Sequence, residues 1–172
     1  GSTITLAVND DSTADGNYDA LSNQTVTAAL TDNDTAGFTK SASSVTVTEA
    51  AGGSNTATFT VVLDSEPSSG SVVIDVTSGT TGQATVSPSS LTFTSGPGNW
   101  DTPQTVTVTG VDNDVDGSNA GSTITLAVND GSTADGNYDA LSNQTVAAAL
   151  TDNDTAGFTK STSSVTVTEA AG

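Results

Sequence analysis

"PQTVTVTGVDNDVDG", residues 103–117, changes character halfway along. Its first half alternates Val with Thr, the two-residue period of a β-strand that turns one face to a core and the other to solvent. Its second half carries Asp112, Asp114 and Asp116 on alternate residues, directly before a glycine. The stretch therefore predicts a half-buried strand that runs into an acidic loop.

The same alternation recurs on both sides of this stretch. Small β-branched residues alternate with Thr or Ser, helical periodicity is absent, and Gly, Pro, Asn and Asp separate the runs. This spacing is typical of an all-β, antiparallel sandwich of about seven strands. We predict the strands at residues 43–49, 56–63, 71–78, 84–94, 103–111, 122–129 and 144–151.

One set of alternating positions in these strands is apolar and defines the predicted core. Roughly 120 residues are enough to bury a core of this kind, although it holds few aromatic side chains. The predicted core residues are Val45, Val47, Phe59, Val61, Leu63, Val72, Ile74, Val76, Leu91, Phe93, Val106, Val108, Ile124, Leu126, Val128, Val146 and Leu150.

The chain contains an internal repeat. Residues 1–52 and 121–172 differ at three positions, which gives a period of 120 residues. A period of this length is a whole domain, so we expect a window on a longer head-to-tail array. We predict that residues 1–36 are the C-terminal part of a preceding repeat, that 37–156 form one complete sandwich, and that 157–172 begin the next.

The composition excludes several functions. The chain has 172 residues, of which 20 are acidic and 2 basic, for a net charge of −18. Nucleic acid is therefore not an expected partner, because phosphate binding needs Lys and Arg. There is no apolar run near 18 residues, so membrane insertion is not expected either. With no Cys or His, and with the paired carboxylates confined to loops, we expect no enzyme.

The predicted topology gathers the acids at the two ends of the sandwich. If successive strands are antiparallel, the loop after 103–111 shares one end with the C-terminus of the domain. The opposite end holds loop acids that would face Asp32 and Asp34 of the preceding linker. The acids expected to converge at the C-terminal end are Glu49, Asp112, Asp114, Asp116, Asp152 and Asp154.

A hard divalent cation would neutralise such a cluster. Two carboxylates about 4 Å apart repel by roughly 4 kcal/mol at an effective dielectric near 20, and basic partners are lacking. Calcium takes 6–8 oxygen ligands, whereas Mg²⁺ seldom uses all-protein cages and the Cys and His that favour zinc are missing. Residues 112–117 match the first half of an EF-hand loop, but Thr123 stands where such a loop needs Glu. We therefore predict Ca²⁺ bound by ligands from several loops.

Further acids are weaker candidates for the same role. Asp135 and Asp139 repeat the alternate spacing around Asn137, where a metal site and a capped turn explain the pattern about equally well. Glu169 is the repeat copy of Glu49 and takes the same prediction in the following unit. Trp100 could stack on a sugar, but a lid on the core accounts for it more simply.

Several motifs resemble the Calx-β type of domain and the tandem repeats of RTX-type bacterial adhesins. They are SSVTVTEAAGG (43–53), VSPSSLTF (86–93), NWDTPQTVTVTGVDND (99–114), DGNYDAL (135–141) and LTDNDTAGF (150–158), the last also similar to cadherin linkers. The resemblance implies an immunoglobulin-like Greek-key sandwich. It implies calcium ligands at a Glu after the first strand and in an acidic loop, which Glu49, Asp112 and Asp114 fit. Acids are missing from SGTTGQATV (78–86), where the Calx-β sensors carry ligands, so structural ions are expected.

The expected function follows from that resemblance. It implies an extender repeat of a bacterial cell-surface adhesin or surface fibre, in which calcium stiffens the junctions between domains. The expected partners are neighbouring repeats of the same chain, or other copies through strand exchange or lateral assembly. Two alternatives stay open, a carbohydrate- or ligand-binding module and a subunit of a laterally assembling filament or sheath.

Overall fold

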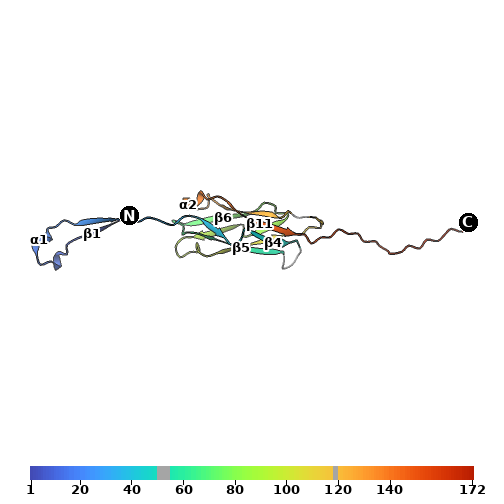
Figure 1. Ribbon diagram of the computed structural model, residues 1–172, viewed down its shortest axis with the longest axis horizontal. Helices are drawn as coiled ribbons and strands as arrows, with labels where there is room; N and C mark the ends of the chain where they lie inside the picture. The colour runs from blue at the N-terminus through green and yellow to red at the C-terminus, as the bar shows by residue number, and fades with distance from the viewer. Residues whose placement is uncertain (50–54, 118–119) are drawn as a thin grey trace. The chain divides into compact units, whose positions relative to one another are not determined.

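The computed structural model describes residues 1–49, 55–117 and 120–172. It divides into two compact units, Gly1–Asp34 and Thr35–Gly172. The protein is mostly β-sheet (Figure 1). Within the described residues, none of the helices has both the length and the apolar character needed to cross a bilayer.

The larger unit is a sandwich of two sheets. One sheet has the strand order β4-β11-β10-β6-β8 and the other β3-β5-β9-β7. The pairing is antiparallel except between β4 and β11, which run parallel. In chain order the strands are β3 (Phe38–Lys40), β4 (Ser44–Thr48), β5 (Thr56–Leu63), β6 (Ser71–Ser78), β7 (Ala84–Ser87), β8 (Ser90–Thr94), β9 (Gln104–Gly110), β10 (Ser122–Val128) and β11 (Gln144–Thr151).

The observed strands depart from the prediction in two ways. The first strand is preceded by a short one, β3, which pairs with β5 in the opposite sheet while β4 pairs with β11. Three residues are too few to show a period, so the alternation could not reveal β3. The predicted strand at 84–94 is two strands in different sheets, β7 and β8, with a cis Ser87–Pro88 peptide between them.

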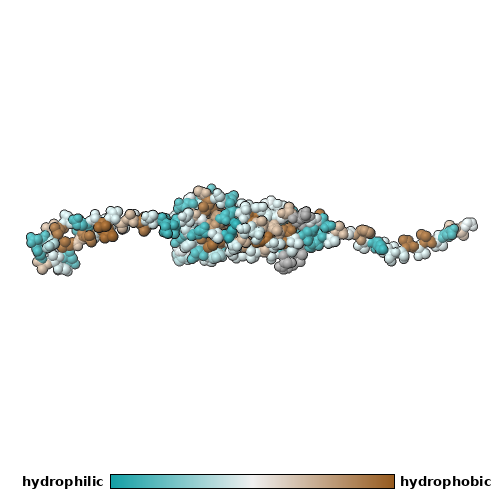
Figure 2. Space-filling model, in the orientation of Figure 1, coloured by the Kyte–Doolittle hydropathy of each residue, from teal (hydrophilic) through white to brown (hydrophobic). Residues whose placement is uncertain are grey.

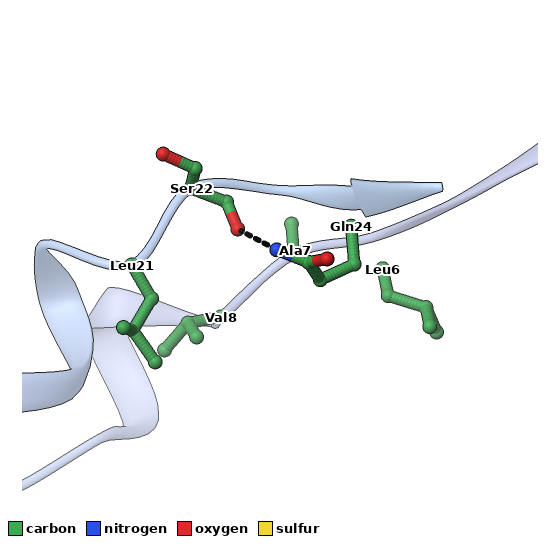
Figure 3. A pocket seen from close by; sticks show the side chains of 6 residues that line it. All are labelled: Leu6, Ala7, Val8, Leu21, Ser22 and Gln24. Atoms are coloured by element: carbon green, nitrogen blue, oxygen red, sulfur yellow. Dashed lines mark hydrogen bonds between the residues drawn. The ribbon is translucent and has the colours of Figure 1, made fainter. Parts of the chain in front are cut away.

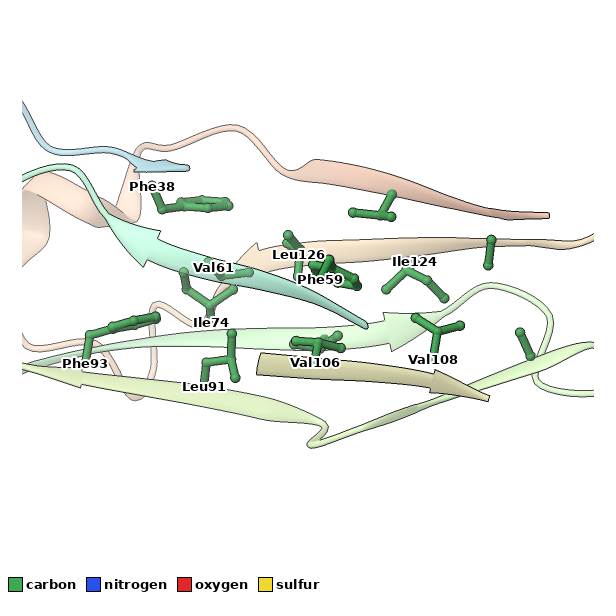
Figure 4. Packing of buried hydrophobic residues seen from close by; sticks show 14 of the residues in the cluster. Phe38, Phe59, Val61, Ile74, Leu91, Phe93, Val106, Val108, Ile124 and Leu126 are labelled. Atoms are coloured by element: carbon green, nitrogen blue, oxygen red, sulfur yellow. The ribbon is translucent and has the colours of Figure 1, made fainter. Parts of the chain in front are cut away.

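The core lies between the two sheets, and the alternation located most of it. Fifteen of the predicted core residues are buried, while Val45 and Val128 are only partly buried against the others (Figure 4). Four buried apolar residues of the described part of the chain were not in the predicted core. They are Phe38 on β3, Tyr138 in the loop between β10 and β11, and two small residues whose size gave no signal, Ala84 and Ala148.

Strand directions sort the loops of the sandwich between its two ends. Strands β4, β9 and β11 all finish at one end, which we call the exit end. The described residues of the β9–β10 loop, 111–117 and 120–121, lie there, and so does the linker that begins at Asp152. The other end, called the entry end, carries the β5–β6 loop and the β10–β11 loop with α2 (Gly136–Asp139), whose residues contact each other.

The smaller unit is a β-hairpin that copies the β10–β11 hairpin. It contains β1 (Ser2–Leu6), the 3-10 turn η1 (Asp10–Ser12), α1 (Gly16–Asp19) and β2 (Gln24–Ala28). Its register matches the copy residue for residue, Ser2 opposite Ala28 as Ser122 is opposite Ala148. The large apolar side chains of this hairpin, such as Ile4, Leu6 and Val26, are exposed, and Figure 2 shows apolar residues on its surface.

Candidate metal centre

Three carboxylates meet at the exit end. One oxygen from each of Glu49, Asp152 and Asp154 lies within 4.8 Å of the other two. Glu49 is fully buried and the two aspartates are partly buried. Among the residues that the structure describes, this is the one group of three metal-ligating side chains held so closely.

The parallel pairing of β4 with β11 creates this arrangement. Thr48 and Thr151 end the two strands as register partners, so the residues that follow them, Glu49 and Asp152, emerge side by side. The Glu49 N–H donates to the Thr151 carbonyl at 3.1 Å and extends the ladder by one bond. A tight turn then brings back Asp154, whose N–H donates to Asp152 Oδ1 at 2.9 Å.

The β9–β10 loop closes over this trio through hydrogen bonds. Asn113 Nδ2 donates to Glu49 Oε1, and the Gly117 N–H donates to Asp152 Oδ2 at 2.8 Å. Asp116 Oδ2 accepts from the Ala156 N–H at 2.9 Å and so ties the loop to the linker. The loop aspartates surround the trio but are exposed and are not among its three members.

The electrostatics of the trio are those of like charges held together. The pKa of Asp154 lies above its ordinary value, first because burial removes water from its carboxylate. Repulsion from Asp152 and from the loop aspartates Asp112, Asp114 and Asp116 raises it further. The pKa of Asp152 lies below its ordinary value, because the N–H groups of Gly117 and Asp154 stabilise its charged form. In this site the charged form of Asp152 is therefore stabilised, whereas that of its neighbour Asp154 is destabilised.

The donor set fits calcium. Asp154 Oδ2 is buried and has no hydrogen-bond partner among the described residues, which leaves it available as a ligand. Every side chain that lines the site offers oxygen, as a hard cation requires, and the chain contains no Cys or His that would favour a softer metal. A cation at this point would also remove the repulsion that raises the pKa of Asp154.

Sequence reasoning missed three residues at this end. Asn113 and Gly117 hold the carboxylates of Glu49 and Asp152, and the amide oxygen of Gln83 is buried without a hydrogen-bond partner within the described ranges. Gln83 lies beside the start of the β9–β10 loop, because the Val111 N–H donates to its carbonyl. Asn113 stands inside the acidic run, where an amide ligand would be expected, but the Gln83 position gave no signal.

The other predicted ligands lie elsewhere. Asp32 and Asp34 are exposed in the smaller unit, where Asp34 N–H donates to Asp32 Oδ1 at 3.1 Å, repeating the turn at Asp152 and Asp154. Glu169 is exposed in residues 155–172, which form no strand. Asp139 is exposed at the entry end.

Asp135 is explained by the fold alone. It is buried, and it caps α2 by accepting from the Asn137 N–H at 3.0 Å. Its second oxygen accepts from the N–H of Ser68 at 2.6 Å and from its hydroxyl at 2.9 Å, which ties two loops together. Burial alone would raise the pKa of Asp135, but these hydrogen bonds outweigh it and hold the pKa below the ordinary value.

Replacing Asp135 by Asn should weaken the entry end. The loss of charge-assisted bonds at a cap should lower the free energy of unfolding by about 1–3 kcal/mol, measured by urea unfolding at pH 7. Because the folded pKa is lowered, the stability from Asp135 is present above pH 3.8 and is lost as the pH falls through the folded pKa. The difference between wild type and Asp135→Asn should therefore shrink in acid.

The matched control for this substitution is Asp15→Asn. Asp15 is the repeat copy of Asp135 and accepts from the Asn17 N–H at 3.0 Å, but it is exposed. It should cost no more than about 0.5 kcal/mol. Equal losses in the two variants would show that the bonds to Ser68 contribute nothing.

The larger unit is an all-β sandwich with a cluster of three carboxylates at its exit end, where β4 and β11 finish. No family model matches the chain, and no curated protein matches it. Among solved structures, the E. coli chaperone DraB is similar with a TM-score of 0.45 and 9% identity, over 72% of this chain and 59% of that chain. The periplasmic chaperone SfaE gives 0.44 and 9%, over 68% and 58%. The chain spans less than two thirds of either chaperone, and likenesses this distant carry no argument about function.

Proposed function

We propose that this chain is a calcium-stabilised structural repeat and that the ion binds at the exit end of each sandwich. The observation that carries the proposal is the convergence of Glu49, Asp152 and Asp154, with an oxygen of Asp154 buried and unpartnered within the described part of the chain. The 120-residue sequence repeat supports a tandem array of such domains, each an immunoglobulin-like, Calx-β-like Greek-key sandwich.

The three ligands come from two different parts of the chain. Glu49 leaves β4, whereas Asp152 and Asp154 belong to the linker that leads toward the next repeat. The β9–β10 loop is bound to the same groups, with Asn113 on Glu49 and Gly117 on Asp152. An ion held by these oxygens would fix the direction in which the linker leaves the sandwich. A rod of such repeats would then be stiff with calcium and loose without it.

The proposal also covers where the protein is located and what it contacts. Calcium is millimolar outside cells, which suits sites with Kd of order 10⁻⁴–10⁻³ M. We therefore place the protein at the bacterial cell surface, as an extender of an adhesin or surface fibre whose partners are its own neighbouring repeats. The carbohydrate-binding alternative is weakened at Trp100, which packs against the hydrophobic core.

Calcium binding itself tests the proposal. Isothermal titration of the chain with CaCl₂, after treatment with EGTA, should show a site that Asp154→Asn weakens at least tenfold. The matched control is Asp34→Asn, since Asp34 is the repeat copy of Asp154 but lies exposed and belongs to no group of three metal-ligating side chains among the described residues. This control should bind as the wild type does. Equal binding by the wild type and Asp154→Asn would refute the proposed site.

A further inference from the structure

The linker between repeats occurs twice in the chain, once at each end of the sandwich. Residues 151–158, TDNDTAGF, repeat residues 31–38 without change. The second copy shows how the linker leaves a sandwich at the exit end, and residues 35–38 of the first copy show how it enters one at the entry end. Because the two sequences are identical, the contacts of both copies apply to every linker of the tandem array proposed above.

At the exit end the linker is held by the β9–β10 loop. Asp152 Oδ1 accepts from the Asp154 N–H at 2.9 Å, and its Oδ2 accepts from the Gly117 N–H at 2.8 Å. Two residues further along the linker, the Ala156 N–H donates to Asp116 Oδ2 at 2.9 Å. Asp116 and Gly117 are neighbours, so one short piece of the loop holds the linker at two points.

At the entry end the linker is held by the β5–β6 loop. The Asp64 N–H donates to the Gly37 carbonyl at 2.9 Å, and the Asp64 carboxylate accepts from the Thr39 hydroxyl at 2.7 Å. The carboxylate lies so close to Gly37 that a Cβ added there would meet Asp64 Oδ2 at 2.5 Å. On either side of this glycine, Ala36 packs against the hydrophobic core and Phe38 is buried in it.

A glutamine on β11 holds the next peptide group of the incoming linker. Gln144 Nε2 donates to the Phe38 carbonyl at 2.6 Å. In the smaller unit its copy, Gln24, lines a pocket of about 270 Å³ and donates instead to the Ser22 carbonyl at 3.2 Å (Figure 3). The bond to Phe38 is therefore a contact with the incoming chain and is not a property of the hairpin by itself.

We propose that consecutive repeats of the tandem array meet at a joint with one free residue, Thr155, and that Asp116 of one repeat and Asp64 of the next position the two sandwiches. The Ala156 N–H bonds to the preceding sandwich, and the side chain of its copy, Ala36, packs on the following one. These contacts use different groups of one residue, so both can form in the same linker. The β9–β10 loop of each sandwich therefore faces the β5–β6 loop of the next.

The joint also brings like charges together. Asp116 holds one residue of the linker and Asp64 holds the residue after it, whose Cα lies about 3.8 Å away. Carboxylates of two repeats therefore gather around one short linker, and they repel each other. Calcium bound by the trio would offset this repulsion, whereas the hydrogen bonds set the direction of the linker. Asp116 is thus a positioning residue and not a ligand, in line with its place outside the trio.

Amide hydrogen exchange, followed by NMR of the full chain in CaCl₂, tests the exit side of the joint. Asp116→Ala should speed the exchange of the Ala156 amide about tenfold, because it removes the acceptor of that N–H. The control is Asp114→Ala, which removes the same charge from an exposed position of the same loop and should leave the Ala156 amide unchanged. Equal exchange in the wild type and Asp116→Ala would overturn the proposal.

Calcium affinity separates positioning from binding. In isothermal titration, Asp116→Ala should bind calcium as Asp114→Ala does. A tenfold loss of affinity confined to Asp116→Ala would make Asp116 a ligand and overturn its positioning role. Absence of calcium binding by the wild type would refute the proposed function alone, because the exchange comparison at Ala156 does not depend on the ion.

The whole joint is tested in the full chain lengthened by residues 53–172, which adds one complete repeat after Gly172. The chain has no Cys, so Thr58→Cys, exposed on β5, can carry a spin label in each of the two complete repeats. Electron paramagnetic resonance gives the distribution of distances between the labels. In CaCl₂ this distribution should broaden at least twofold with Asp116→Ala in the first complete repeat, or with Asp64→Ala in the second.

The controls for the joint are Asp114→Ala at the exit end and Asp101→Ala at the entry end, which remove exposed carboxylates. Both should leave the distance distribution as narrow as in the wild type. Equal broadening by the controls would show that charge alone matters and would overturn the roles of Asp116 and Asp64. A wild-type distribution as broad as that of Asp116→Ala would overturn the joint itself.

Discussion

Removing calcium should lower the melting temperature of the sandwich by about 10 °C. A ligand that binds only the folded state stabilises it by about 2.7 kcal/mol at a hundredfold excess over Kd. In a domain of this size each kcal/mol shifts the melting temperature by several degrees. Scanning calorimetry in 10 mM CaCl₂ and in EGTA measures the difference. The effect should be large because the trio combines a buried glutamate with two linker aspartates.

The substitution Glu49→Gln separates the effect of calcium binding on stability from the effect of the side chain itself. Gln keeps the shape of Glu and an oxygen that can accept from Asn113, but it removes a buried negative charge. The variant should therefore melt no lower than the wild type in EGTA, and calcium should no longer raise its melting temperature. Glu169→Gln, the copy in the exposed tail, should respond to calcium as the wild type does. If calcium still stabilises Glu49→Gln fully, the ion binds elsewhere.

Ile124→Ala should cost about 2–5 kcal/mol of unfolding free energy, because it opens a cavity in a fully buried site. Ile4→Ala makes the same chemical change at the copy of this position, where the side chain is 52% exposed. It should cost no more than about 0.5 kcal/mol. Urea unfolding measures both losses.

This pair of substitutions tests the division of the chain into a packed sandwich and a hairpin with a bare face. The two positions share their neighbours in sequence and their register, with Ile4 opposite Val26 and Ile124 opposite Val146. They differ in their surroundings, because Ile124 is also opposite Ser78 of β6 and faces a second sheet, whereas β1 and β2 form a two-stranded sheet. Similar losses in the two variants would mean that the hairpin is packed as well as the sandwich is, and would contradict the exposure of its apolar face.

The sequence predicted the strands well because a two-residue period is a local property. Residues 56–63 and 71–78 were predicted to the residue as β5 and β6, since each alternates without interruption. What failed depended on contacts between distant residues. The alternation of 84–94 could not show that β7 and β8 lie in different sheets, and Tyr138 is buried only because the loop between β10 and β11 folds against Ser65.

The sequence predicted which acidic residues lie at the exit end, but it did not predict which of them come together. Strand direction alone was enough to place Glu49, Asp152 and Asp154 at one end. The alternate aspartates of residues 112–116 looked like the centre of the site, yet they lie around it, and Asn113 between them makes the contact to Glu49. Which loop residue contacts Glu49 depends on how the β9–β10 loop folds over the three carboxylates. The spacing of residues in the sequence does not show this.

The parallel contact of β4 with β11 also sets how the sandwich would respond to mechanical tension. A pull applied through residues 35 and 152 draws these two strands lengthwise in opposite directions, so their hydrogen bonds are loaded in shear. The five registered pairs from Ser44 to Thr48 would then have to break nearly together, and not one after another as in a hairpin peeled from its end. The strand pair that brings the three carboxylates together is thus also the longest clamp between the two points of pull, since β3, which the pull reaches earlier, has only three registered pairs with β5.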